Sequence, residues 1–234
     1  SARLPDGVVG HVDLQGESDA AGADTSPLVV TLPADATLSG LASDAVAVDG
    51  LRALVASATK VTLLDVSTTF SPDTLADTTG PGRTVRSLSF SGTKAALATD
   101  DEVVLYNIDG CQNAAHCVTE AARIPFASDG PTTALAVEGR RTILAVADDV
   151  GGIAVFGYVD GRLDLTGQVD VDGVVRGLAL TPLGLVVLLD QQGSALLEVR
   201  DVRDGALTPI SDLTLVGGPA SSLAAFGTQL AVTT

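Results

Sequence analysis

The chain has 234 residues, enough for one large domain or two small ones. Hydrophobic residues make up 46% of it, yet its formal net charge is -16 and aromatic residues contribute only 3%. This apolar content is too high for a disordered chain. The negative charge argues against nucleic acid and anionic membranes as partners, because both would repel it. No apolar run approaches the roughly 18 residues that a membrane span needs, so we expect no membrane insertion.

The first predicted strands lie near the start of the chain, at residues 8–14 and 27–32. The polar stretch 16–26 between them is predicted to be a surface loop. Because the sequence starts with Ser1 rather than Met, we expect a trimmed or mature form.

From residue 45 onward a unit of two apolar strands joined by a tight turn recurs along the chain. Its turns are 42 to 47 residues apart, and a period in this range is typical of the four-stranded blades of a β-propeller. The copies cover residues 45–56, 87–98, 134–145, 177–188 and 222–232, with turns at Gly50, Gly92, Gly139, Pro182 and Gly227.

Third and fourth strands are predicted after each of the first four copies. The third strands are 61–66, 103–108, 153–156 and 195–199, and the fourth are 73–79, 119–126, 163–169 and 209–215. The fifth copy has two strands only, whereas residues 8–14 resemble a third strand and residues 27–32 a fourth. Closing the ring with both chain ends in one blade would leave no sheet edge exposed between blades.

The sequence therefore predicts one all-β domain over residues 1–234, a five-bladed β-propeller of four-stranded antiparallel blades. The N- and C-terminal strands are predicted to share one blade. Each inner strand alternates bulky with small side chains, as in Val48 and Ala47, which suits blades that stack around a ring. The predicted blade cores are 43–79, 84–127, 132–169, 175–215, and 220–234 together with 8–32.

Two of the third strands carry a resemblance to a known group of repeats. They read Val-Thr-Leu-Leu-Asp-Val at 61–66 and Val-Val-Leu-Tyr-Asn-Ile at 103–108, each after an apolar hairpin. This resembles bacterial β-propeller repeats of the LVIVD or YVTN type. The Trp-Asp pairs of WD40 blades and the Gly doublets of kelch blades are missing. The resemblance implies a fold class and no particular activity.

A candidate binding site lies where the chain enters each inner strand, at the predicted mouth of the channel. Two arginines facing the channel axis could hold a carboxylate or a phosphate, because a guanidinium group can form two parallel hydrogen bonds with such a group. Alternatively, the acidic and basic members neutralise each other, or water fills the channel. The predicted ring consists of Asp44, Arg86, Thr133, Arg176 and Ser221.

A second candidate is an acidic rim in the turns between second and third strands. Clustered carboxylates suit Ca²⁺, which takes six to eight oxygen ligands. However, the calcium-loop signature is absent, and Asp is also a favoured turn residue for local backbone reasons. The rim residues are Asp100, Asp101, Asp148, Asp149 and Asp190. Apart from this calcium hypothesis, we expect no cofactor.

Cys111 and Cys117, the two cysteines of the chain, stand six residues apart. This spacing predicts a local disulfide across a loop, and a disulfide implies an oxidising compartment. A zinc site with His116 would lack a fourth ligand. We therefore expect an extracytoplasmic protein, whether secreted, periplasmic or on the cell surface.

No catalytic signature is apparent. Neither His11 nor His116 stands in a nucleophile motif such as Gly-x-Ser-x-Gly. We expect a non-enzymatic binding or protein-interaction scaffold outside the cytoplasm, with a protein or a small polar molecule as partner. One alternative is a propeller that binds small anions or glycans through Arg86 and Arg176. Another is a five-bladed enzyme resembling glycoside hydrolases, which use two carboxylates about 5–10 Å apart.

Overall fold

The computed structural model describes residues 43–67, 72–109, 111, 117–126, 130–140, 142–203, 205–215, 218–226 and 229–233. These residues form β-strands and their connections, with no helix among them. Four sheets have four antiparallel strands each, and β17 (Ser222–Phe226) and β18 (Gln229–Thr233) form a two-stranded sheet.

The four-stranded sheets each follow the order of the chain from the first strand to the fourth. The first sheet contains β1 (Ala45–Asp49), β2 (Arg52–Ala56), β3 (Lys60–Asp65) and β4 (Asp73–Thr79). The second contains β5 (Ser87–Ser91), β6 (Lys94–Ala98), β7 (Glu102–Ile108) and β8 (Val118–Pro125). The third contains β9 (Thr132–Glu138), β10 (Ile143–Asp148), β11 (Gly152–Val159) and β12 (Arg162–Asp170). The fourth contains β13 (Val174–Thr181), β14 (Gly184–Gln191), β15 (Ser194–Arg200) and β16 (Pro209–Leu215).

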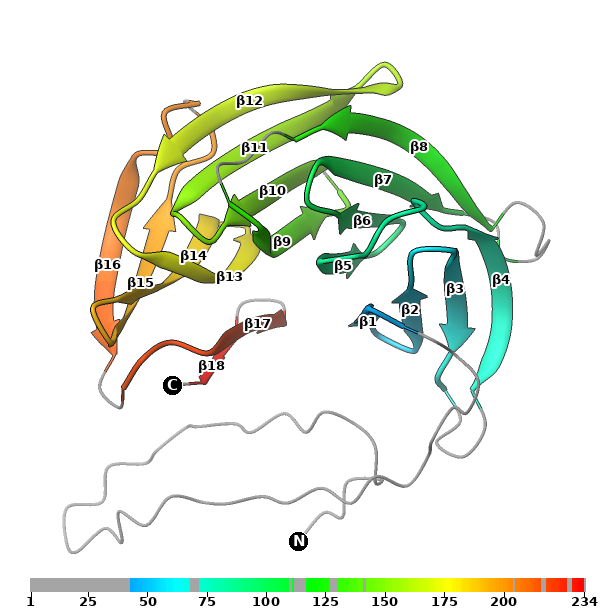
Figure 1. Cartoon of the computed structure of the whole chain (residues 1–234), viewed down its shortest axis with the longest axis horizontal. Helices are drawn as coiled ribbons and strands as arrows, with labels where there is room; N and C mark the ends of the chain where they lie inside the picture. Colours follow the sequence, from blue (N-terminus) through cyan, green and yellow to red (C-terminus); the bar gives the residue numbers. More distant parts are fainter. Residues whose placement is uncertain are drawn as a thin grey trace, which may run out of the picture.

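The sheets stand side by side in an arc, with their first strands innermost and their fourth strands outermost (Figure 1). Along the inside of the arc, β5 contacts β1 and β9, and β13 contacts β9 and β17. This radial arrangement of four-stranded antiparallel sheets is a β-propeller, so the predicted fold class is confirmed. The predicted strands 8–14 and 27–32 lie outside the described residues, and the five-bladed closure stays a prediction.

The inner hairpins depend on residues that tolerate left-handed backbone. Gly50 and Gly92 both have φ of +61° in two-residue turns, where a side chain would be strained. The third hairpin differs from this pattern. Glu138 pairs with Ile143 across a longer turn, in which Thr142, rather than Gly139, adopts positive φ, at 51°.

Separate apolar cores fill the spaces between successive sheets. In each core, small side chains on one sheet pack against bulky side chains on the next. Between the second and third sheets, for example, Ala96 and Ala98 pack with Leu135, Val137 and other apolar side chains. Across the same interface the Ser89 hydroxyl accepts a hydrogen bond of 3.0 Å from the Val137 amide. The alternation predicted along the inner strands thus generates the stacking of the blades.

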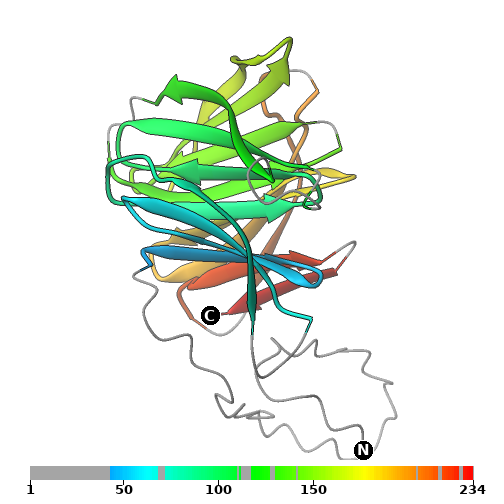
Figure 2. The ribbon, with the colours of Figure 1, turned by 90° about the vertical axis from the view of Figure 1, so that its right-hand side faces the viewer.

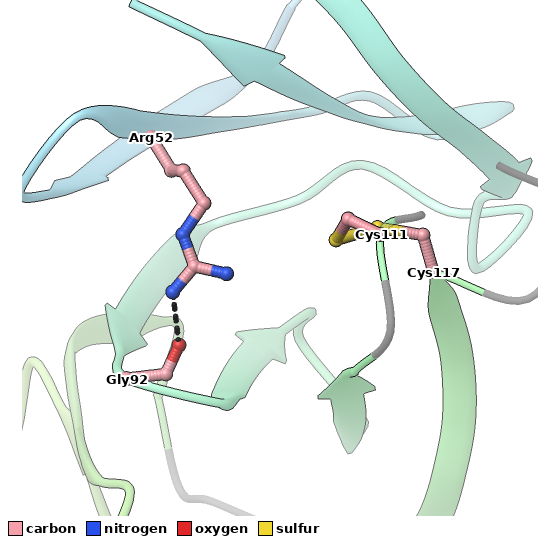
Figure 3. The surroundings of a disulfide bond; sticks show 4 residues. All are labelled: Arg52, Gly92, Cys111 and Cys117. Atoms are coloured by element: carbon pink, nitrogen blue, oxygen red, sulfur yellow. Dashed lines mark hydrogen bonds between the residues drawn. A yellow bond between two sulfur atoms is a disulfide. The ribbon is translucent and has the colours of Figure 1, made fainter. Parts of the chain in front are cut away.

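The predicted disulfide is present. Cys111 and Cys117 are bonded, with their Cα atoms 4.5 Å apart, at the connection between β7 and β8. The Cys117 side chain is fully buried and belongs to the apolar core between the first two sheets. Figure 3 shows the bridge near the first two inner hairpins, which are tied by a 2.8 Å hydrogen bond from the Arg52 guanidinium to the Gly92 carbonyl.

Gly177 allows β13 and β17 to approach closely. A Cβ atom on Gly177 would lie 2.5 Å from the Leu223 Cβ and 3.1 Å from its backbone nitrogen. We therefore expect Gly177→Ala to lower the free energy of unfolding by about 1–3 kcal/mol through overpacking. For a chain of this size, each kcal/mol corresponds to roughly 2–4 °C in Tm, measurable by calorimetry.

Gly157→Ala is the matched control for this substitution. Its new Cβ would approach only the methyl end of Thr166, at 3.2 Å. Alanine is intrinsically better than glycine in a strand. An equal loss of Tm in both variants would show that the packing of Gly177 against Leu223 is not the cause.

Candidate functional site

One end of the propeller collects the connections that lead into the inner strands and the turns between second and third strands. We call this end the entry face. Hydrogen bonds join the two kinds of loop in successive blades, from Gly80 N to Thr59 O (2.9 Å), from Phe126 N to Asp101 O (3.0 Å) and from Val171 N to Gly151 O (2.9 Å). Figure 2 shows the strands from the side, running between the two ends of the molecule. The described entry face comprises residues 43–44, 57–59, 80–86, 99–101, 126, 130–131, 149–151, 171–173, 191–193 and 218–221, with the adjoining strand ends.

Arg86 lies immediately before β5 and forms a bidentate ion pair with Asp100. Its Nε donates to Asp100 Oδ1 at 2.8 Å and its Nη2 donates to Oδ2 at 2.9 Å. Both side chains are about half exposed. The hydrogen bonds from Arg86 lower the pKa of Asp100 below its ordinary value of 3.8, with burial opposing and the guanidinium charge assisting the shift. Asp100 in turn raises the pKa of Arg86.

Arg176 lies in β13 where the strand register shifts, between Val175 and Gly177. It occupies the place equivalent to Arg86 and pairs with Asp190. The distance from Nη2 to Oδ2 is 3.4 Å, longer than in the Arg86 pair. Asp190 is the more buried partner, and its other oxygen accepts a 3.2 Å hydrogen bond from Gly193 N in its own turn. The chain thus places the same Arg–Asp pair on the entry face in two blades.

The other three members of the predicted ring are also at the entries to the inner strands. Asp44 accepts a 3.1 Å hydrogen bond from the Val85 amide of the next blade. The Thr133 hydroxyl donates to the Asp148 carbonyl at 3.0 Å. The Ser221 amide donates to the Thr233 carbonyl at 2.9 Å. These residues share one face as predicted, and whether they bind a ligand stays a prediction.

The arginine ring and the acidic rim, predicted as two separate sites, are joined in the structure. The alternative prediction was neutralisation of the arginines by Asp44, but their direct partners are Asp100 and Asp190. Each partner follows its arginine by 14 residues. That recurrent spacing was visible in the sequence. Only the hairpin between the first and second strands, which returns the chain to the same end, brings the two side chains of each pair together.

The remaining rim residues have different surroundings. Asp101 pairs with Arg83 at 2.8 Å. Asp148 is buried, and its Oδ1 accepts hydrogen bonds from Val150 N and Gly152 N, so it stabilises its own turn. The Oδ1 atom of Asp149 is buried without a hydrogen-bond partner in the part of the chain described.

The predicted calcium site gains no support from this geometry. Among the described residues, no group of three or more His, Cys, Asp or Glu side chains is arranged to hold a metal ion. A calcium ion would need six to eight oxygen ligands. Asp100 and Asp190 are instead engaged by guanidinium groups.

Carboxylates outnumber guanidinium groups on the entry face. The described basic side chains Lys60, Arg83, Arg86 and Arg176 at this end each pair with an aspartate. Further acidic side chains, Asp44, Asp149 and Asp172, add negative charge at the same end. A face of one dominant sign attracts ligands of the opposite sign and accelerates their association.

Comparisons with known proteins support the fold. No protein-family model and no curated protein matches the chain. A protein from Lactobacillus plantarum has a crystal structure similar at a TM-score of 0.57 with 25% identity, over 72% of this chain and 54% of that protein. Chaetomium thermophilum Sqt1, solved bound to the N-terminus of a ribosomal protein, is similar at a TM-score of 0.55 with 14% identity, over 74% of this chain and 48% of Sqt1. The computationally designed Ika4 protein gives a TM-score of 0.50 and 21% identity, over 70% of this chain and 96% of Ika4.

The chain therefore spans about half the length of the first two of these structures. The similarities agree with a propeller and leave the predicted LVIVD or YVTN repeat type as a prediction. No helix that could cross a membrane occurs in the described ranges.

The ion pair between Arg86 and Asp100 can be tested by titration. In Arg86→Ala, we expect the pKa of Asp100 to rise toward 3.8, because its main hydrogen-bond donor is lost. A depressed folded-state pKa stabilises the protein above the unfolded-state value near 4, and this contribution disappears as the pH falls through the folded-state pKa. Carboxyl NMR titration measures the change. Arg176→Ala is the control, and an equal shift of Asp100 in that variant would contradict the assignment.

Proposed function

We propose that this chain is a non-enzymatic binding propeller that holds a positively charged segment of a partner protein on its entry face. The observation that carries the proposal is the excess of carboxylates on this face, together with the internal pairing of its arginines. A cationic segment would meet negative potential along the loops, with backbone and side-chain oxygens available as acceptors.

Binding of small anions fits this face less well. A carboxylate or phosphate approaching Arg86 would have to displace Asp100, which already accepts hydrogen bonds from the Nε and Nη2 atoms of the guanidinium group. At Arg176 it would compete with Asp190. The neighbouring carboxylates would also repel it. The geometry therefore favours a cation over an anion as the ligand group.

We place this activity outside the cytoplasm. The support for this location is the disulfide between Cys111 and Cys117, because such bonds persist in oxidising compartments. The net charge of -16 agrees with a protein that stays soluble there.

Peptide binding tests the proposed ligand class. A fluorescent oligolysine decapeptide should bind the protein in an anisotropy titration, and an oligoglutamate decapeptide should not. Replacing Asp44, Asp149 and Asp172 together by Asn should weaken oligolysine binding by roughly tenfold, if each charge contributes about 0.5 kcal/mol at a solvated surface. Added salt should weaken binding through screening.

The control removes the same charge from the opposite end of the molecule. At that end Asp65 is the last residue of β3, Asp109 follows β7, and Asp160 lies between β11 and β12. Their joint replacement by Asn changes the net charge equally. If this variant lost as much affinity as the entry-face variant, the attraction would be a property of total charge and the proposed site would be wrong.

The proposed location has a separate test. In cells of the source organism, alkylation of free thiols before lysis should leave both cysteines unlabelled, and reduction should then expose two thiols. Mass spectrometry of the peptide carrying Cys111 and Cys117 reads the result. A fully alkylated peptide from freshly quenched cells would place the protein in a reducing compartment.

A further inference from the structure

The hairpin between β11 and β12 carries an aspartate and a glycine at its tip, on the outer side of the arc (Figure 1). Val159 pairs with Arg162, so Asp160 and Gly161 form a two-residue turn, with φ of +51° and +83°. Both turn residues are exposed. The space beside the glycine is open, because a Cβ built on it would meet no atom within 4 Å.

An exposed Asp-Gly pair can react with itself. The backbone nitrogen of the glycine attacks the side-chain carboxyl carbon, Cγ, of the protonated aspartate. A C–N bond forms, the bond from Cγ to its hydroxyl breaks, and the hydroxyl leaves with the amide proton as water, which produces a five-membered succinimide ring. Water then opens the ring at either carbonyl carbon. Opening at the main-chain carbonyl leaves the peptide bond on Cγ, and the residue has become isoaspartate.

We propose that Asp160 is the site at which the folded protein forms isoaspartate. In the part of the chain described, no hydrogen bond or ion pair engages the Asp160 carboxyl group, so its Cγ is free to turn toward the Gly161 nitrogen. The Gly161 amide has no backbone acceptor there either. Asp160 also has left-handed backbone, which is uncommon for a residue with a side chain. The isoaspartyl linkage adds a rotatable bond to the main chain and relieves this constraint.

The two other Asp-Gly pairs that lie wholly within the described ranges are held in place. Asp49 accepts a hydrogen bond from the Gly92 amide of the next blade. Asp172 accepts one of 3.2 Å from the side-chain amide of Gln191. Its glycine, Gly173, packs so closely that a Cβ would lie 2.9 Å from a backbone oxygen of the neighbouring turn. In both pairs the carboxylate must leave its donor before the ring can form, so the structure distinguishes the β11–β12 turn from other copies of the same motif.

Isoaspartate formation changes this hairpin without changing its charge. The carboxyl group is retained on Cα, while the main chain gains one methylene group. A two-residue turn matches the twist of its strands, so the longer turn weakens the pairing of Val159 with Arg162. The inference is independent of the proposed partner, because this turn lies at the end of the molecule opposite the entry face.

Ageing of the full-length chain tests the proposal. After several weeks at neutral pH and body temperature, the folded protein should carry isoaspartate at residue 160, located by electron-transfer fragmentation of its peptides in a mass spectrometer. Asp49 and Asp172 should react roughly fivefold more slowly, the factor that corresponds to one hydrogen bond. The same chain unfolded in urea is the control, because all three pairs are free there and should react at similar rates.

Two variants sharpen the test. Asp160→Glu should abolish the reaction at this position, because its longer side chain would have to close a six-membered ring. Asp160→Asn should form the same succinimide with loss of ammonia and gain a carboxylate, seen as an acidic shift in isoelectric focusing. Because that reaction restores the charge, the control variant for peptide binding is assayed on freshly purified protein.

Either of two results would overturn the proposal. The first is isoaspartate at residue 160 in the unfolded chain but not in the folded protein, because the turn would then protect the pair. The second is equal rates at Asp49, Asp160 and Asp172 in the folded protein, because the reaction would then follow the sequence motif alone. Neither result bears on binding of oligolysine, so the two proposals fail separately.

Discussion

The whole structure depends on the contact between a small sheet face and a bulky one. A propeller blade must approach its neighbour closely along the inner strands and less closely outside. Alanine, serine and glycine on one face leave room for leucine, valine and phenylalanine on the next. Because the chain has few aromatic residues, this fit, rather than large rings, excludes water from the cores. Gly177 is its extreme case, since a single methyl group there would collide with Leu223.

The same stacking determines where charge gathers. Each blade sends its second-to-third-strand turn and its outgoing connection to one end, so acidic residues scattered through the chain meet there. Three guanidinium groups of the described residues lie among them, those of Arg83, Arg86 and Arg176, and each pairs with an aspartate. Exposed ion pairs of this kind contribute little to stability, typically below about 1 kcal/mol. Their main effect in the described part of this face is to occupy the guanidinium groups, so the remaining carboxylates give the face its negative charge.

The ends of the arc differ from its interior. Val46 and Val48, on the inner strand of the first sheet, are 63% and 59% exposed, whereas the corresponding Leu135 and Val137 on β9 are buried. At the interfaces between successive described sheets, the bulky side chains of one inner strand pack against small side chains of the neighbouring sheet.

Much of the fold could be predicted from the sequence alone. The recurring turns, the alternation of side-chain size and the strand ranges, including the faint strand Asp73–Thr79, are local patterns, and the two cysteines stand close enough to define their own loop. The pairing of Arg86 with Asp100 and of Arg176 with Asp190 was not foreseen. Nor was the turn conformation at Thr142. Those depend on which side chains the hairpins and neighbouring blades bring within a few ångströms, and that is decided by three-dimensional packing rather than by any run of residues.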